Sequence, residues 1–382
     1  MALSKIDVAN MLTGLVPNDN TIRRPNAKPL IINGNMAVAQ KATSVTSLTS
    51  SGAVQTVDRI KNEICSIGTY TVAQESLSSG NAYNNGFRKA WRIDCTSADA
   101  SPAAGDNLYV TYHFEGQDLQ LFKKGTSNAQ KFTLAFWIKS NKTGTGQVNL
   151  RDNDNSRLIG GTYTISSADT WEHKVVNFAA DTTGAFDNDN AGSMDIEWWL
   201  DSGTTYSSGA TPTAWEAFSQ ADRNASGNLQ IARNTANDWA ITGIQLEVGE
   251  FSSTTLPPFQ FEDFGDNKNR CLRYYYRLNP DADAQASIGE ASYYSSSAAF
   301  TCLEFPIAMR DSPSLEQTTG TDYFNLNRNS ANDSFDTFNN LNASDHTSAQ
   351  LYISSGISGT AGHGARCRFN DASARLAFSA EL

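Results

Sequence analysis

The sequence contains few of the residues and motifs from which catalytic and metal centres are usually built. It has 4 histidines and 5 cysteines among 382 residues, and the cysteines are widely separated, with no Cys-x-x-Cys pair. Because zinc sites and disulfide frameworks need regularly spaced cysteines, we expect neither, and we expect no bound metal. No histidine accompanies a GxSxG nucleophile motif, and no GxxxxGK[ST] or GxGxxG motif follows a strand. The sequence therefore indicates no enzyme and no cofactor.

Long apolar runs and excess positive charge are also absent. No segment approaches the ~18 consecutive apolar residues that span a bilayer, and the first 15 residues lack the apolar core of a signal peptide. Lys and Arg number 29 against 40 Asp and Glu, which gives a net charge of −11. This balance argues against nucleic acid or an anionic membrane as a partner. We expect a chain that is made in the cytoplasm and not inserted into a membrane.

Short segments that alternate apolar and polar residues succeed one another from about residue 29 to 260. The apolar set is Leu108, Val110, Tyr112 and Phe114 in one segment, and Phe132, Leu134, Phe136 and Ile138 in the next. Further segments span 158–165, 171–178, 194–200 and 239–248. A period of two is typical of strands with one buried face, and many short strands with polar turns indicate an all-β, jelly-roll β-sandwich. One helix is expected after Pro212, from Ala214 to Arg223.

The composition divides the chain into three parts. Residues 1–28 are predicted to form a short N-terminal arm, because they contain little alternation and are interrupted by prolines. Residues 29–262 are predicted to form the jelly roll. The segment LPPF and the polar connector that follows it interrupt the strand pattern. Residues 263–382 are therefore predicted to form a smaller C-terminal β domain.

The alternation in 194–201 predicts a candidate carbohydrate-binding face. Met194, Ile196, Trp198 and Leu200 are expected to face the core, so that Asp195, Glu197, Trp199 and Asp201 face outward. Sugars stack their C–H faces on indole rings and donate hydroxyl hydrogen bonds to carboxylates. The candidate glycan-binding residues are Trp199, Glu197, Asp195, Trp137, Lys139, Tyr109 and His113. The alternative is that this face is covered and forms a second core layer.

The acidic residues allow two other interpretations. Asp195 and Glu197, two residues apart on one strand face, have the spacing of a glycosidase carboxylate pair, although such pairs also occur in many non-enzymes. The clusters 152–155 and 187–190, both Asp-Asn-Asp-Asn, have the oxygen ligands that calcium prefers. Tyr163 and Trp198 stand where an EF-hand needs its last glutamate. Turns capped by Asx side chains are the better explanation of both clusters.

Several segments resemble a family of phage tail fibre and virion-appendage proteins from tailed phages of aquatic bacteria. The resemblance rests on PLIINGNMAVAQKATS, EGQDLQLFKKGTSNAQKFTLAFWIKSNKTGTGQVNL, ADTWEHKVVNFAADTTGAFDNDNAGSMDIEWWL and WAITGIQLEVGE, and covers 29–277. RCLRYYYRL, FPIAMRDSPS and the terminal FSAEL are similar to the distal domain of such fibres. The middle part is similar to jelly-roll carbohydrate-binding modules, in which strands such as FTLAFWIKS and ITGIQLEVG recur.

The resemblance implies a homotrimeric, non-enzymatic receptor-binding tail fibre located in the virion. Its arm would attach to another virion protein, in the tail, baseplate or capsid, through Met1, Ile6, Leu12, Arg23 and Arg24. Its outer domains would contact a glycan or protein of the host cell surface. The sequence has no heptad, Gly-X-Y or solenoid repeat, which argues against a long shaft and against a depolymerase tailspike. The alternative is a structural virion protein without a ligand, such as a capsid fibre or decoration or a tail adaptor.

Overall fold

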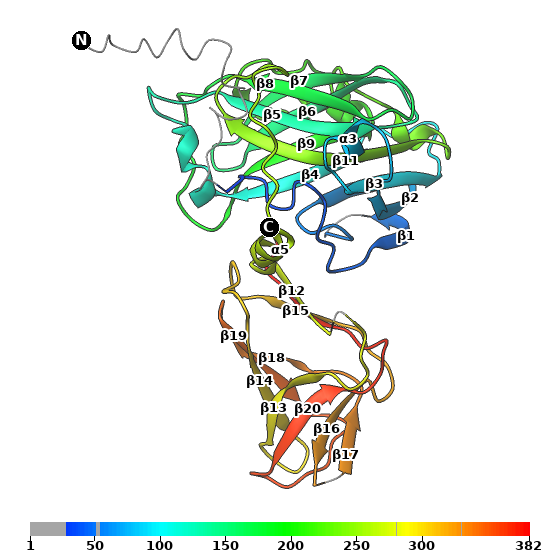
Figure 1. Cartoon of the computed structure of the whole chain (residues 1–382), viewed down its shortest axis with the longest axis vertical. Coiled ribbons are helices and arrows are strands. Elements are labelled where there is room, and N and C mark those ends of the chain that lie inside the picture. The colour runs from blue at the N-terminus through cyan, green and yellow to red at the C-terminus, as the bar shows by residue number, and fades with distance from the viewer. Residues whose placement is uncertain (1–27, 51–53, 280, 330) are drawn as a thin grey trace, which may run out of the picture.

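The computed structural model describes residues 28–50, 54–279, 281–329 and 331–382, which form two β-rich domains joined by a short helix (Figure 1). The five predicted virion-attachment residues, Met1, Ile6, Leu12, Arg23 and Arg24, lie outside the described residues. Strands are the main regular secondary structure of both domains, which confirms the predicted β-sandwich followed by a smaller β domain. No helix in the described part of the chain is long and apolar enough to cross a membrane.

The strands of the larger domain form one sheet that folds over into two layers. Its strands are β1 Ser44–Ser50, β2 Lys61–Ser76, β3 Lys89–Ser97, β4 Asn107–Glu115, β5 Phe132–Lys139, β6 Gly144–Asp152, β7 Arg157–Ile165, β8 Glu172–Phe178, β9 Gly192–Ser202, β10 Glu216–Ala217 and β11 Asp238–Val248. They are ordered β10-β7-β6-β9-β4-β2-β3-β11-β5-β8, and β1 also pairs with β2. The helical turns are α3 Asn81–Asn84, α4 Thr204–Ser207, η1 Gly116–Asp118, η2 Gln120–Phe122, η3 Gln220–Asp222 and η4 Ile231–Arg233.

The long strand β2 belongs to both layers. Its first residues pair with β4 and its last with β3. Between these two parts, Ser66 and Gly68 have positive φ angles of 52° and 98°, a backbone conformation in which a strand changes direction. The first layer therefore contains β4, β9, β6 and β7, and the second contains β3, β11, β5 and β8.

Alternating residues of the two layers meet in one hydrophobic core. Phe136 of β5 makes edge-to-face contacts with Trp198 of β9 and Tyr163 of β7, at ring-centroid distances of 5.9 and 5.2 Å. The predicted inward residues of 108–114, 132–138 and 194–200 all belong to this buried core. The period-two prediction of which residues face the core is thus confirmed for these three strands.

The helix predicted at Ala214 to Arg223 is wrong. Glu216–Ala217 instead pairs with β7 as the short strand β10, and only the single turn η3 follows it. Trp215 is almost buried and donates from Nε1 to the carbonyl of Ala179. Tertiary contacts of this kind hold the segment against the sheet and outweigh its local helix preference.

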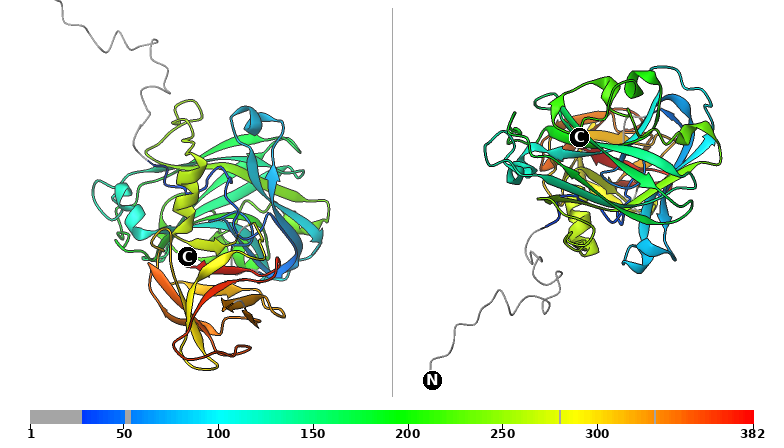
Figure 2. Two further views of the ribbon diagram at one scale, coloured as in Figure 1. Left: turned by 60° about the horizontal axis from the view of Figure 1, so that its bottom comes forward. Right: turned by 90° about the horizontal axis from the view of Figure 1, so that it is seen from above.

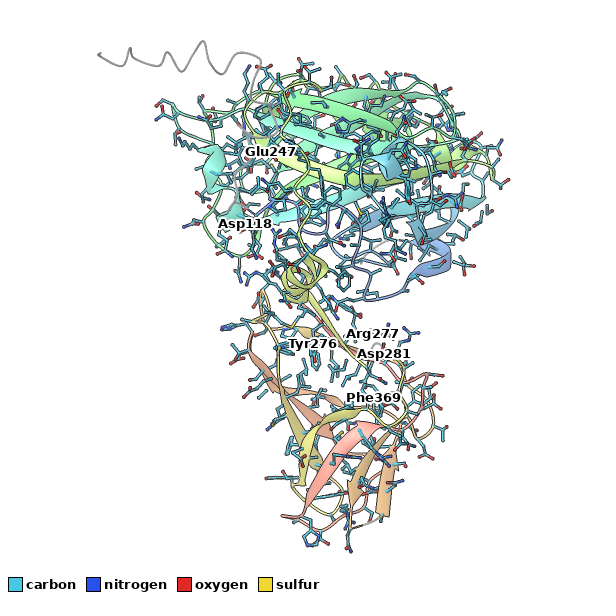
Figure 3. The ribbon with its side chains drawn as sticks, viewed as in Figure 1. Asp118, Glu247, Tyr276, Arg277, Asp281 and Phe369 are labelled. Carbon is cyan, nitrogen blue, oxygen red and sulfur yellow. The ribbon has the colours of Figure 1, made fainter. Side chains whose placement is uncertain are left out.

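The smaller domain contains two further sheets. Its strands are β12 Tyr275–Leu278, β13 Ser287–Tyr293, β14 Ala299–Glu304, β15 Ser314–Gln317, β16 Phe324–Arg328, β17 Ala331–Phe335, β18 Asn340–Ser344, β19 Ser348–Ile353, β20 Gly364–Phe369 and β21 Leu376–Ser379. The orders are β12-β21-β15 and β17-β16-β20-β13-β14-β19-β18. Their apolar faces form a second core, separate from that of the jelly roll, which includes Phe369 (Figure 3).

Helix α5 (Phe264–Leu272) connects the domains, and charged side chains hold them together. Arg273 binds both carboxylate oxygens of Glu115 at 2.8 and 2.7 Å, and Arg59 donates to Glu381 at 2.9 Å. The C-terminus lies at this junction (Figures 1 and 2), where Leu382 packs against a small buried cluster. The predicted boundary between residues 262 and 263 falls just before α5, whose N-cap is Asp263.

Asp58 lies buried at the same junction, and we expect it to make stability depend on pH. Burial raises its pKa to about 7, against the opposing effect of hydrogen bonds from Gln40. The unfolded chain loses the Asp58 proton near pH 4 and the folded chain near pH 7. The free energy of unfolding should therefore fall as pH rises through this window, by roughly 1.4 kcal/mol per unit of pKa difference.

The substitution Asp58→Asn tests this dependence. Its effect is measured by urea unfolding of the variant and the wild type at pH 5 and pH 8. The loss of stability between the two pH values should be smaller in the variant, because its amide does not titrate. Equal losses in the two proteins would contradict the assignment.

Candidate functional site

Five of the seven predicted glycan-binding residues lie together on the outer face of β4 and β9. Tyr109 pairs with Trp199 across the two strands, and His113 pairs with Asp195. This face is not exposed, however, and the alternative interpretation, that it is covered and forms a second core layer, is confirmed. Trp199 and Asp201 are 0% exposed and Glu197 is 1% exposed. The segment between β9 and β11 returns over the face and covers it, so the face is a second buried layer.

Arg223, from the covering segment, supplies the main contacts to this layer. Its Nη2 and Nε donate to the two carboxylate oxygens of Glu197 at 2.6 and 3.0 Å. Its guanidinium lies 4.5 Å from the Trp199 ring, and that ring stacks on Tyr109 at 4.5 Å. Trp199 also donates from Nε1 to Glu197 at 3.0 Å. The predicted sugar-stacking ring is therefore occupied by the protein's own arginine.

Asp195 is held in its charged form at the edge of this layer. It contacts Nδ1 of His113 at 2.5 Å and accepts from Asn153 at 3.0 Å. Burial alone would raise the pKa of Asp195, but the interactions with His113 and Asn153 outweigh burial and lower it. A glycosidase acid needs a raised pKa, so the geometry of Asp195 does not favour the glycosidase interpretation.

Trp137 is not part of this face, contrary to the prediction. It lies on β5, in the other layer, with its ring centroid 5.0 Å from that of His173. It packs against a small cluster that includes Phe87 and Trp171, while Lys139 on the same strand reaches Glu75 at 3.3 Å. The sequence indicates that Trp137 faces away from the core but not which layer its strand joins.

The two Asp-Asn-Asp-Asn clusters are turns, as predicted. Asp152 accepts from the backbone N–H of Asn155 at 3.0 Å, and Asp189 accepts from that of Ala191 at 3.0 Å. Among the residues described, no group of three or more His, Cys, Asp or Glu side chains is arranged to hold a metal ion.

An open aromatic surface is found instead on the C-terminal domain. Tyr294 is 75% exposed, the largest exposed fraction among the large apolar side chains that the structure describes. Its ring lies 5.7 Å from that of Phe300 on β14, and Phe300 stacks on Tyr352 of β19 at 5.1 Å. We call Tyr294, Phe300 and Tyr352 the aromatic row. Phe300 and Tyr352 are opposite each other in the sheet, so the row runs across the strands.

Polar side chains lie beside the aromatic row on the same face. Asn342 donates to Gln350 at 2.7 Å, and Gln350 lies 3.6 Å from the Cys302 sulfur. Ser292 and Asn340, which pair with Phe300 and Tyr352 respectively, are both exposed. This arrangement offers ring faces for apolar contact and amide and hydroxyl groups for hydrogen bonds, the two features that sugar recognition uses.

The aromatic row was not predicted, although the sequence contains a signal for it. In Ala299–Glu304, Ala299, Thr301 and Leu303 alternate with Phe300, Cys302 and Glu304. The first set faces the core or is mostly covered, which places Phe300 on the outer face. An aromatic residue among polar ones on a solvent face is the same signal that was applied to Trp199.

Comparison of the sequence with protein-family models and with curated proteins gave no match. Solved structures gave distant likenesses. An enzymatically active domain of tailspike protein 4 from bacteriophage CBA120 has a TM-score of 0.30 and 11% identity, over 58% of this chain and 21% of that chain. A putative sugar-binding protein from Bacteroides thetaiotaomicron has a TM-score of 0.29 and 12% identity, over 58% of this chain and 100% of that one. A family 11 carbohydrate-binding module from Clostridium thermocellum, in complex with a mixed-linked tetrasaccharide, has a TM-score of 0.26 and 11% identity, over 55% of this chain and 99% of that one.

Proposed function

We propose that this chain is a non-catalytic receptor-binding tail fibre that binds a host surface glycan through the aromatic row. The observation that carries the proposal is the row itself, in which Tyr294 is 75% exposed and leads to the stacked pair Phe300 and Tyr352. Exposing a large aromatic ring to water is unfavourable unless a partner covers it. A sugar ring that lies across the row would bury these faces and bond to the polar groups beside them.

The virion role rests on the sequence resemblance, which extends over nearly the whole chain. In this proposal the N-terminal arm attaches to a tail, baseplate or capsid protein, and the chain assembles as a homotrimer in the virion. A single shallow sugar site binds weakly. Three linked copies raise the overall avidity by about 10² to 10⁴ when all can engage at once.

Adsorption of the purified protein to host cells, and its binding to a glycan array, test this proposal. Tyr294→Ala and Tyr352→Ala should each weaken binding of a matched glycan by about tenfold per site, equivalent to ~1.4 kcal/mol. The matched control is Phe261→Ala, which removes another half-exposed aromatic ring, on the jelly roll. It should leave binding unchanged.

Three results would contradict parts of the proposal. If the wild type binds neither glycans nor cells, the chain fits a structural virion protein such as a capsid decoration or tail adaptor. Equal losses in Tyr294→Ala and Phe261→Ala would move the site away from the aromatic row. A monomer in light scattering would exclude the homotrimer.

A further inference from the structure

A cleft of about 580 Å³ opens at the junction of the two domains. Its walls come from the segment before β1, from α5, and from the C-terminal domain, and include Gln40, Thr43, Phe264 and Arg375. Figure 3 shows Arg277, which also lines the cleft, at the narrow junction between the domains. A cleft of this size suits a small ligand of one or two sugar rings.

The charge of this cleft is opposite to that of the chain. Lys268, Arg277 and Arg375 line it, and no Asp or Glu is among its lining residues, whereas the whole chain has a net charge of −11. Burial and the nearby positive charge of Arg375 lower the pKa of Arg277. Arg277 and Arg375 thus both line the cleft; Glu316, which lines an adjoining pocket with the same two arginines, is already paired with Lys41. Two guanidinium groups at one cleft favour a bound anion.

The three cations have unused hydrogen-bonding capacity. Arg277 donates from Nη1 to the carbonyls of Gln40 and Lys41 at 3.1 and 3.4 Å, but its Nε is shielded from solvent and has no acceptor among the described residues. The side chains of Lys268 and Arg375 form no ion pair within the described part of the chain. Lys41 nearby is different, because it is paired with Glu316 at 2.9 Å.

An exposed aromatic ring completes the cleft. Phe264 is 60% exposed, and it precedes Lys268 by four residues on α5, so that both side chains lie on one helix face and line the cleft. Thr43 and Ser44 add hydroxyl groups to the lining of the cleft. The cleft thus combines a cationic end, an apolar ring face and polar groups.

We propose that this cleft binds a carboxylate-bearing sugar, with the carboxylate between Arg277 and Arg375 and the sugar ring on Phe264. Arginine pairs carboxylates through two parallel hydrogen bonds, and stacking on the aromatic ring distinguishes a sugar acid from a simple anion. The site is separate from the aromatic row. It rests on the proposed function only in assigning the ligand to a surface glycan.

Isothermal titration calorimetry of the purified full chain with D-glucuronate, D-glucose and inorganic phosphate tests the assignment. We expect glucuronate to bind at least about tenfold more tightly than either glucose or phosphate. Arg375→Ala and Phe264→Ala should each weaken glucuronate binding by about tenfold. Arg375 is suited to this test because it is exposed and because, within the described part of the chain, its hydrogen bonds use only its backbone atoms.

The outcomes separate this site from the aromatic row. Tyr294→Ala should bind glucuronate normally even where it has lost adsorption to host cells. Equal binding of glucuronate and glucose, or no effect of Arg375→Ala, would overturn the proposal. Phosphate binding as tight as that of glucuronate, together with no effect of Phe264→Ala, would show a simple anion site and would also overturn it.

Discussion

Replacing Arg223 by alanine should lower the free energy of unfolding of the jelly roll by about 3–5 kcal/mol. Glu197 is 1% exposed, and Arg223 is its bidentate partner. Without that partner, a carboxylate stays buried against the Trp199 ring with too few donors to replace water. The substitution also uncovers part of the stacked pair formed by Trp199 and Tyr109. Urea unfolding of the variant and the wild type at pH 7 measures the loss.

A second arginine near the same carboxylate provides the matched control. Arg151 lies 3.8 Å from Glu197, but its side chain is 35% exposed. Arg151→Ala should therefore cost less than about 1 kcal/mol. Adding Glu197→Gln to the Arg223→Ala variant should restore part of the stability, because it removes the unpaired charge. If Arg223→Ala costs no more than Arg151→Ala, the ion pair does not hold the covering segment in place.

This buried layer marks the limit of what alternation along a strand can predict. The period of two correctly placed Ile196 and Trp198 in the core and Glu197 and Trp199 on the other face. It carries no information about whether another segment later covers that second face. The covering residue, Arg223, lies 26 positions after Glu197, in a segment whose local pattern predicted a helix. Whether the outer face of a strand is exposed therefore depends on tertiary contacts, which the sequence of that strand does not reveal.

The alternation of residues also does not predict the order of the strands in the sheet. Trp137 and Trp199 each face away from the core, yet they lie on opposite layers because β5 joins β11 while β9 joins β4. The aromatic row is different, since alternation within β14 is enough to place Phe300 outside. The all-β class and the inward faces followed from local sequence, whereas the choice between open and covered faces depended on long-range pairing.

Replacing Lys124 by methionine should also cost about 3–5 kcal/mol at neutral pH. Lys124 is fully buried and lies between two carboxylates, 2.6 Å from Asp152 and 3.0 Å from Asp181. It also donates to the carbonyls of Thr183 and Gly184 at 3.0 and 2.7 Å. Methionine matches the length of the stem but leaves Asp152, which is 0% exposed, without its cation.

The pH dependence of this loss identifies its cause. Burial would raise the pKa of Asp181, but hydrogen bonds from Arg157, Lys124 and the Thr183 N–H, together with the charge of Lys124, outweigh burial and lower it in the folded protein. The ionised Asp181 carboxylate therefore makes its full contribution to the free energy of unfolding above pH ~4, the pKa of Asp in the unfolded chain. This contribution declines as pH falls below that value. In Lys124→Met, protonation of Asp181 reduces the negative charge that Lys124 balances in the wild type. The stability gap between variant and wild type should thus narrow from pH 7 to pH 4.

The same substitution at the neighbouring Lys123 is the control, because it removes a lysine charge that is not buried. Lys123 is exposed, and Lys123→Met should change the free energy of unfolding by less than about 0.5 kcal/mol at either pH. A gap for Lys124→Met that stays constant with pH would mean that methionine packs badly and that charge is not responsible. A gap that narrows would show that Lys124 provides, within the fold, the positive charge that these Asp-rich loops require. The calcium interpretation of the 152–155 cluster would then be unnecessary, because the cation is covalently part of the chain.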